Sequence, residues 1–222
     1  MKYIKPILPL FLLFFFFGCT TEEAKETEMS SRTQVIMGTF CTLSLEVSHA
    51  QELTPGFEKL KEVEQVLSSY KEDALVSLLN KNRHIKSHPM LREILKKSKS
   101  YYAQTQGYFD ITIGSITKKL YHFGEEEQIP TKEALGIAPL GVENIFIAKD
   151  FIRLKNNITI DLGGIGKGYG VDVLAAYYQA KGITKGQIAL SGDIRCLDLC
   201  DIAIQSPFEE DATIALFQAK IP

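Results

Sequence analysis

A glycine-rich stretch between an apparent strand and an apparent helix constrains the fold of this chain more than any other feature. It spans residues 158–178, ITIDLGGIGKGYGVDVLAAYY. The β-branched start is typical of a strand, and apolar residues at helical spacing in the second half predict a helix that ends near Ala180. The glycines leave backbone N–H groups open near the start of that helix, where the helix dipole attracts negative charge. With Lys167 beside them, these groups predict an anion site, and a phosphate is its natural ligand.

The familiar phosphate-binding patterns do not match this bend. A G-x-G-x-x-G pattern would require glycine where the chain has Tyr169, Val171 or Val173. The nucleotide-triphosphatase loop requires Ser or Thr after Gly-Lys, whereas Gly168 follows Lys167. Alternatively, the glycines only let a helix pack closely against a sheet. The bend alone leaves both interpretations open.

The first 31 residues have the composition of a targeting segment followed by a tether. Residues 1–19 carry two lysines, then an apolar run that is short for a membrane-spanning helix, then Gly18 before Cys19. We expect a bacterial lipoprotein signal with Cys19 as the lipidated first residue; an uncleaved membrane anchor is the alternative. Residues 20–31 are polar and predict a flexible tether. Both alternatives place the domain, expected at residues 32–222, outside the cytoplasm and attached to a membrane.

Composition narrows the classes of function that this domain can serve. The chain is 45% hydrophobic, which suits a globular domain with a core, and its net charge is −2. No block of like charge suggests a nucleic-acid partner. Cys196 and Cys200 could form a disulfide in an oxidising compartment or remain small strand residues. Neither has a nearby histidine, so the spacing does not suggest zinc.

Hydrophobic spacing predicts an α+β fold in which helices pack on a mainly antiparallel sheet. Helices are expected at about residues 51–67, 74–79, 89–107, 116–121, 131–136 and from the glycine bend to 180. Pro89 fits the first turn of the third of these helices, and Thr131 could cap the fifth. Strands are expected at about residues 34–47, with Gly38 as a bend or bulge, and at 158–162, 187–190, 194–199, 202–205 and 213–217. Residues 144–148 and 151–155 are expected to pair as a hairpin. Because helices come first and hairpins follow, the order does not fit an alternating βαβ fold.

A set of short motifs recurs in a fixed order along the chain. The motifs are MGT at 37–39, SSY at 68–70, GYFDITIG at 107–114, DLGGIGKGYGVD at 161–172 and LSGDIR at 190–195. In this order they resemble the FAD:protein FMN transferase (ApbE-type) family over about residues 34–207. The resemblance implies a periplasm-facing enzyme that splits FAD with Mg2+. It would join FMN to a threonine hydroxyl of a target flavoprotein, such as a subunit of a sodium-pumping redox complex.

The resemblance also assigns site residues by position. The family's FAD contacts match Met37, Tyr70, Tyr108, Phe109, Asp110, Asp161 and Lys167, and a metal ligand matches the carbonyl of Gly164. Aromatic faces can stack on rings, carboxylates can accept from ribose or adenine, and a lysine can balance diphosphate charge. Each residue also has a structural alternative: core packing for Met37 and Phe109, turns or caps for Tyr70 and the two aspartates, and solvated surface for Lys167. Asp193 is expected to be structural.

The chain departs from the family pattern at its end. It stops at Pro222 without the Thr-Ser-Gly, Asp-Pro-x-Thr-Gly and Asp-rich segments that supply most metal ligands and the candidate general base in the family. The carbonyl of Gly164 alone is too little for Mg2+, which takes six oxygen ligands. Three functions therefore stay open: a transferase whose C-terminal portion is missing from this chain, a lipoprotein that binds FAD without chemistry, and an inactive truncated fragment.

Overall fold

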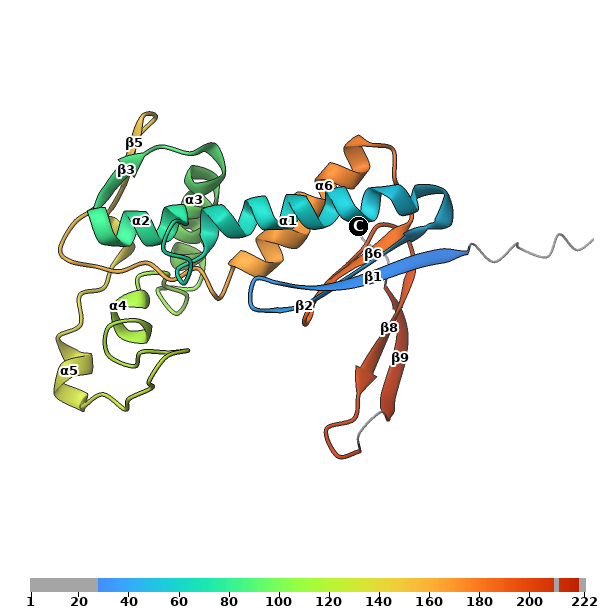
Figure 1. Cartoon of the computed structure of the whole chain (residues 1–222). Helices are drawn as coiled ribbons and strands as arrows, with labels where there is room; N and C mark the ends of the chain where they lie inside the picture. The colour runs from blue at the N-terminus through green and yellow to red at the C-terminus, as the bar shows by residue number, and fades with distance from the viewer. Residues whose placement is uncertain (1–27, 210–211, 220–222) are drawn as a thin grey trace, which may run out of the picture.

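Two 15-residue helices, α1 (Leu53–Leu67) and α6 (Gly166–Ala180), run through the centre of the fold and lie against each other (Figure 1). The computed structural model describes residues 28–209 and 212–219. Each of the two helices contributes one part of its apolar face to one hydrophobic core and the other part to a second core. The helices thereby join the two halves of the molecule.

The first half is a four-stranded antiparallel sheet in the order β1-β2-β6-β7. Its strands are β1 (Met29–Ile36), β2 (Thr39–Glu46), β6 (Gly186–Leu190) and β7 (Asp193–Cys196), and the 3-10 helix η1 (Val47–Glu52) leads from β2 into α1. Alternate residues of β2 are buried, as expected of a strand with one face on a core. That core contains Leu43, Phe57 and Tyr178, which are fully buried.

The second half contains short helices and a small sheet. Its helices are α2 (Leu75–Asn82), α3 (Pro89–Gln104), α4 (Gly114–Thr117), α5 (Lys132–Gly136) and the 3-10 helix η2 (Val142–Asn144). Its antiparallel sheet has the order β3-β5-β4, made of β3 (His84–Lys86), β5 (Phe151–Leu154) and β4 (Ile145–Ile147). Tyr169 of α6 and Leu67 of α1 pack into the core of this half.

A hairpin of β8 (Cys200–Gln205) and β9 (Thr213–Ala219) projects from the rest of the fold (Figure 1). Within residues 28–209 and 212–219 these two strands pair only with each other. Their apolar side chains Ile204, Ile214 and Leu216 are exposed. A disulfide between Cys196 and Cys200, whose Cα atoms are 5.7 Å apart, joins the start of the hairpin to the end of β7.

The predicted α+β class with antiparallel sheets is confirmed. The helix predicted to start at Pro89 starts there, and the side chain of Thr131 accepts a hydrogen bond from the N–H group of Ala134 (3.2 Å), as a cap at this position should. The predicted pairing of residues 144–148 with 151–155 is the β4–β5 hairpin.

The chain bends at Gly38, as expected, but it turns back completely there and does not continue as one strand over residues 34–47. Met37 and Gly38 both have positive φ, +53° and +72°, and turn the chain between β1 and β2. A two-residue turn with positive φ matches the twist of a hairpin, but it normally carries Asn, Asp or Gly at the position that Met37 holds. The tether expected at residues 20–31 is also too long, because β1 starts at Met29.

The targeting segment falls outside the residues that the structure describes. This applies to residues 1–19, to the lipidation site Cys19 and to residues 20–27 of the tether. Among the residues that are described, no helix combines the length and the apolar character needed to cross a membrane.

Candidate functional site

Residues 158–162, which lead into the glycine bend, are held in place by side chains from α2. The side chain of Asn80 accepts from the N–H group of Ile160 and donates to its carbonyl, both at 2.8 Å. Arg83 donates to the carbonyl of Ile158 at 2.5 Å. The expectation of a regular strand here is therefore wrong, because these side chains supply the bonds that a neighbouring strand would make, and Thr159 forms only an isolated bridge with Ile113.

The GYFDITIG motif lies directly beside this segment. The N–H group of Asp161 donates to the carbonyl of Ile111 at 2.8 Å, and the hydroxyl of Ser115 accepts from the N–H group of Thr159 at 2.8 Å. A Cβ atom on Gly114 would lie 2.6 Å from the carbonyl oxygen of Thr159. Only glycine allows the two backbones to approach this closely, so two distant motifs meet at one corner.

The bend itself uses some of its N–H groups and leaves others open. Asp161 Oδ1 accepts from the N–H group of Gly163 at 2.9 Å, and the carbonyl of Leu162 accepts from Ile165 and Gly166. The N–H groups of Gly164, Lys167 and Gly168 make no hydrogen bond to any residue that the structure describes. These open donors lie at the start of α6, where the helix dipole is positive.

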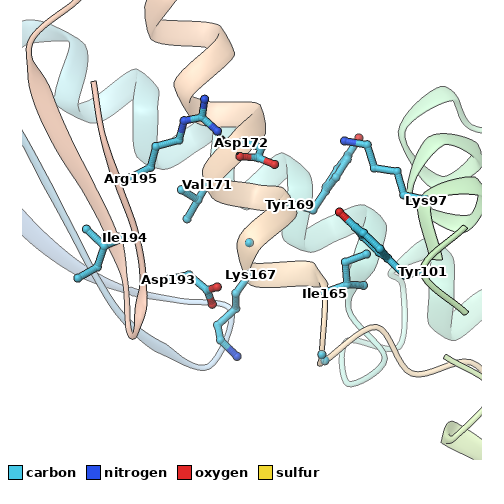
Figure 2. Close-up of a pocket in the computed structure, with 13 residues that line it drawn as sticks. Lys97, Tyr101, Ile165, Lys167, Tyr169, Val171, Asp172, Asp193, Ile194 and Arg195 are labelled. Carbon is cyan, nitrogen blue, oxygen red and sulfur yellow. Dashed lines mark hydrogen bonds and ion pairs between the residues drawn. The ribbon is translucent and has the colours of Figure 1, made fainter. Parts of the chain in front are cut away.

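A cleft of about 430 Å3 opens beside these donors (Figure 2). Its walls come from α3, from the bend with the first turns of α6, and from β7; they are Lys97, Tyr101, Gly163, Gly164, Ile165, Lys167, Gly168, Tyr169, Val171, Asp172, Asp193, Ile194 and Arg195. Lys167 and Asp193 lie together near the N-terminus of α6, and Tyr101 points toward Tyr169 from the opposite wall.

The charged groups along the cleft are partly paired. Arg195 and Asp172 form an ion pair at 2.6 Å, while the Nε atom of Arg195 is buried and has no hydrogen-bond partner in the described part of the chain. The hydroxyl of Tyr169 donates to Glu93 at 3.0 Å. Burial and the neighbouring Glu93 raise the pKa of Tyr169 well above its usual range, so this hydroxyl stays protonated and does not act as a base.

Residues 37–220 match the profile of the ApbE family. The chain belongs to the ApbE family.

Several ApbE proteins are similar to this chain. The FAD:protein FMN transferase of Vibrio cholerae is 31% identical over 176 residues, which cover 70% of this chain and 51% of that protein. The corresponding Escherichia coli K12 protein is 26% identical, with 90% of this chain and 64% of that protein covered. The chain thus spans about half to two thirds of the length of these curated relatives.

Solved ApbE structures have the same fold. The flavin transferase ApbE from Vibrio cholerae superposes with a TM-score of 0.74 at 25% identity, covering 85% of this chain and 68% of that one. The ApbE protein from Thermotoga maritima gives a TM-score of 0.79 at 20% identity and covers 87% and 68%. The latter likeness concerns the fold alone.

The structure brings some of the predicted ApbE site residues together at the cleft. Gly164 and Lys167 line the cleft, and Asp161 accepts a hydrogen bond from the N–H group of Gly163 within the bend. Phe109 lies next to the bend, since its ring is 3.5 Å from the Cβ position of Gly164, and it packs edge-on against Tyr101 with centroids 6.1 Å apart.

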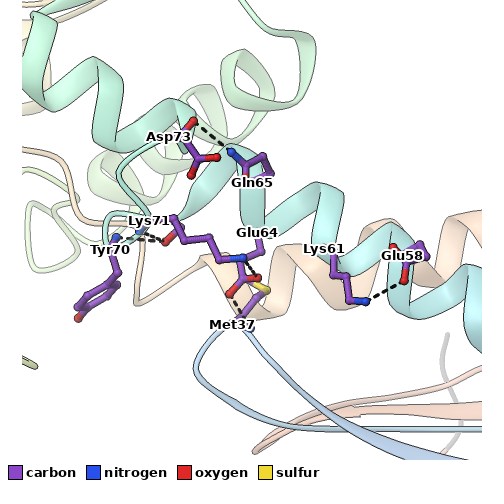
Figure 3. Close-up of polar contacts among 9 residues, drawn as sticks. Met37, Glu58, Lys61, Glu64, Gln65, Tyr70, Lys71 and Asp73 are labelled. Atoms are coloured by element: carbon purple, nitrogen blue, oxygen red, sulfur yellow. Dashed lines mark hydrogen bonds and ion pairs between the residues drawn. The ribbon is translucent and has the colours of Figure 1, made fainter.

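Met37 lies behind the bend and does not line the cleft. Its side chain packs into both cores and reaches the glycines of α6, with the sulfur 3.5 Å from the Cβ position of Gly170. The N–H group of Met37 donates to Glu64 at 3.0 Å, and the other oxygen of Glu64 accepts from the Lys71 ammonium (Figure 3). Glu64 therefore connects the MGT turn to the turn that carries Tyr70.

The remaining predicted contacts lie outside the cleft. Tyr70 is 56% exposed and Tyr108 is 95% exposed. Asp110 accepts from both the N–H group and the hydroxyl of Thr112, at 2.8 and 2.7 Å, which is the turn role named as its alternative.

Sequence reasoning missed several residues of the site. Asp193 was expected to be structural, but it lines the cleft and lies 3.4 Å from the Cβ position of Gly168. Asp172 lies within the motif DLGGIGKGYGVD and Arg195 within LSGDIR, so these motifs could have indicated both residues. Glu64 had no signal in the sequence, because its role depends on two turns that meet only in the fold.

The donor set for a metal ion is incomplete in the described residues. Within residues 28–209 and 212–219 no three side chains of His, Cys, Asp or Glu are grouped closely enough to hold an ion. Both carboxylate oxygens of Asp161 already accept hydrogen bonds, from Gly163 and from the hydroxyl of Thr117. The carbonyl of Gly164 would be one ligand of the six that Mg2+ takes, so these residues do not by themselves fit that ion.

Proposed function

We propose that this chain binds FAD with its diphosphate on the glycine bend, as the flavin-binding part of a FAD:protein FMN transferase. The observation that carries the proposal is the set of open N–H groups of Gly164, Lys167 and Gly168 at the start of α6. N–H groups at a helix N-terminus bind phosphate oxygens, and the Lys167 side chain adds a positive charge at the same place. The names of the curated relatives support FAD as the ligand.

The reaction we propose is transfer of FMN to a threonine hydroxyl of a target flavoprotein. The threonine oxygen would bond to the FMN phosphorus as the bond from that phosphorus to the bridging oxygen breaks; AMP would leave and a base would take the hydroxyl proton. Such transfers depend mostly on positioning and charge stabilisation, which is the part that the bend and Lys167 would supply. Mg2+ is expected from the resemblance, but the described residues do not make up a site for it.

We further propose that the protein is a lipoprotein anchored through Cys19 and that its domain faces the periplasm. The lysines, the apolar run and Gly18 before Cys19 support this location. The disulfide between Cys196 and Cys200 supports it independently, because disulfides persist in oxidising compartments.

Titration of the chain with FAD tests the proposal. We expect FAD to bind, with quenching of its fluorescence as the readout, and ADP to compete better than riboflavin, which has no phosphate. Lys167→Met should weaken FAD binding by roughly tenfold or more, as expected for loss of a charge-assisted contact. Lys132→Met on the exposed start of α5 is the control and should bind FAD as the unmodified chain does. Absence of FAD binding, or equal affinities for the two variants, would reject the site.

A FAD-binding lipoprotein without transferase activity is the second candidate, and the incomplete donor set for a metal ion favours it. Incubation with FAD, Mg2+ and an acceptor domain distinguishes the two. Covalent flavin on the acceptor, detected by mass spectrometry, supports the transferase, whereas FAD binding without covalent flavin supports the second candidate. A single sharp thermal transition of the chain would argue against an inactive fragment.

A further inference from the structure

Lys118, which directly follows α4, has a charged group in an unusual position. Its ammonium nitrogen is buried and has no hydrogen-bond partner in the part of the chain that the structure describes. It lies over the ring of Tyr70, 2.9 Å from the ring centroid. An ammonium group normally keeps water or an acceptor around it, because a buried charge without partners is costly. The contact with the face of the Tyr70 ring offsets part of this cost, because an aromatic face attracts a cation.

The residue before Lys118 makes the matching contact with the glycine bend. The hydroxyl of Thr117 donates to Asp161 Oδ2 at 2.8 Å, and Oδ1 of the same carboxylate accepts from the N–H group of Gly163. Two consecutive residues at the end of α4 therefore hold two separate parts of the proposed site. Thr117 holds the bend, and Lys118 holds the ring of Tyr70.

The chain after Lys118 closes around the same ring. Gly124 lies against the ring edge, since a Cβ atom on it would be 3.2 Å from Cε1 of Tyr70. The loop is fixed to α4 by hydrogen bonds from the N–H groups of Phe123 and Tyr121 to the carbonyls of Thr117 (2.8 Å) and Ile116 (2.9 Å). The ring of Tyr70 is thus supported on one side and at its edge, while 56% of the residue stays exposed.

We propose that Lys118 is a positioning residue for FAD binding. Its ammonium holds the ring of Tyr70 at a fixed place relative to the glycine bend, so that the exposed part of the ring is ready to stack on a flat ring of FAD while the diphosphate lies on the bend. This inference rests on the proposed function, and it assigns to Lys118 an action through Tyr70 and no contact with FAD.

The FAD dissociation constants of matched lysine variants test this role. Lys118→Met removes the charge at similar length, and Lys118→Gln is a second neutral replacement for use if the first variant does not fold. We expect FAD binding to weaken about threefold to tenfold, the range of a cation–π contact at a partly desolvated site. Lys118→Arg keeps a cation that can lie on the ring and should restore most of the affinity. Lys119→Met changes the exposed neighbour and should have no effect.

A double-mutant cycle with Tyr70→Leu separates positioning from direct contact. If Lys118 acts through Tyr70, then Lys118→Met combined with Tyr70→Leu binds FAD no more weakly than Tyr70→Leu alone. Additive losses would mean that Lys118 contacts FAD itself, and would overturn the inference.

A measurement without FAD tests the contact independently of the proposed function. The chain is labelled with 3-fluorotyrosine, and the fluorine resonance of Tyr70 is identified by its loss in Tyr70→Phe. This resonance should shift in Lys118→Met and stay in place in Lys119→Met; no shift in either would overturn the contact. If the unmodified chain binds no FAD, the proposed function fails and the positioning role fails with it. If that chain binds FAD and Lys118→Met binds equally well, the role of Lys118 alone is overturned.

Discussion

The two ends of the proposed FAD site differ in how much of each the fold buries. The segment before the glycine bend is buried and bonded from α2 and from the GYFDITIG segment, and the bend continues into a helix that passes through both cores. The aromatic residues Tyr70 and Tyr108 are instead 56% and 95% exposed. The fold therefore forms the phosphate end before any ligand arrives, whereas at the ring end it leaves apolar surface that a ligand would cover.

The two ends should therefore respond differently to substitutions. A change at the phosphate end should lower both the free energy of unfolding and the affinity for FAD, because the same bonds serve both. A change at the ring end should lower the affinity and leave the free energy of unfolding almost unchanged. A change at a residue between the two ends should lower the affinity for FAD and should lower the free energy of unfolding only in part.

Asn80→Ala should have the largest effect on stability. It removes both hydrogen bonds to the backbone of Ile160, which is fully buried, and leaves a donor and an acceptor unsatisfied. Each unsatisfied buried group costs about 1–3 kcal/mol, so we expect a loss of roughly 2–4 kcal/mol in the free energy of unfolding, measured with urea. FAD binding should weaken as well, because the bend loses its support.

The control for this change lies in the same helix. Asn82 is exposed at the end of α2, and Asn82→Ala should change the free energy of unfolding by less than about 0.5 kcal/mol. Equal losses for the two asparagine variants would show that the segment before the bend does not depend on Asn80.

Sequence patterns predicted the parts of the fold that local hydrophobic spacing determines. The helices that bury Phe57 and Leu91, the cap at Thr131 and the β4–β5 hairpin all follow from residues near one another in the chain. Gly38 predicts a bend, but it does not predict the complete turn, because Met37 is apolar and gives no turn signal although its φ is positive. The extended segment at 158–162 has the β-branched composition of a strand, but its hydrogen-bond partner Asn80 lies in α2, about 80 residues away, and local sequence does not indicate such a partner.

The candidate site could be predicted only where a motif contained the residue. Lys167 follows from the bend and Gly164 from the family resemblance, and both line the cleft. Tyr101 lies on α3, and helical spacing alone predicts for it only a place on the apolar face of that helix. Lys118 resembled any other lysine near a helix end, and its contact with Tyr70 depends on how a loop closes around α4. Such contacts come from tertiary packing, for which one sequence carries no direct signal.

Glu64→Gln should have an intermediate effect. The substitution keeps an oxygen for the N–H group of Met37 but removes the charge that attracts Lys71 (Figure 3). Because the ammonium of Lys71 is partly exposed, the free energy of unfolding should fall by only about 0–1 kcal/mol. The turn that carries Tyr70 should become less restrained, and we expect FAD affinity, measured by fluorescence titration, to fall by roughly twofold to fivefold, consistent with an ion pair of that strength.

Glu58→Gln breaks a comparable ion pair on the same helix and serves as the control. Glu58 pairs with Lys61 at 2.8 Å on the exposed side of α1, and it contacts neither of the two turns (Figure 3). FAD affinity should not change in this variant. If FAD affinity fell as much in Glu58→Gln as in Glu64→Gln, the effect would come from the general loss of charge on α1. The link that Glu64 makes between the two turns would then not explain it.

Tyr108→Leu should have the smallest effect on stability and still weaken FAD binding. Almost the whole side chain is exposed, so the free energy of unfolding should change by less than about 0.5 kcal/mol. Loss of an aromatic stacking partner worth roughly 0.5–1.5 kcal/mol corresponds to about a twofold to tenfold weaker FAD complex in a fluorescence titration. Phe208→Leu is the matched control, because Phe208 is 93% exposed but lies on the β8–β9 hairpin. Phe208→Leu should leave FAD affinity unchanged. If Tyr108→Leu also left it unchanged, Tyr108 would not belong to the ring end, and Tyr70 would be its remaining aromatic residue.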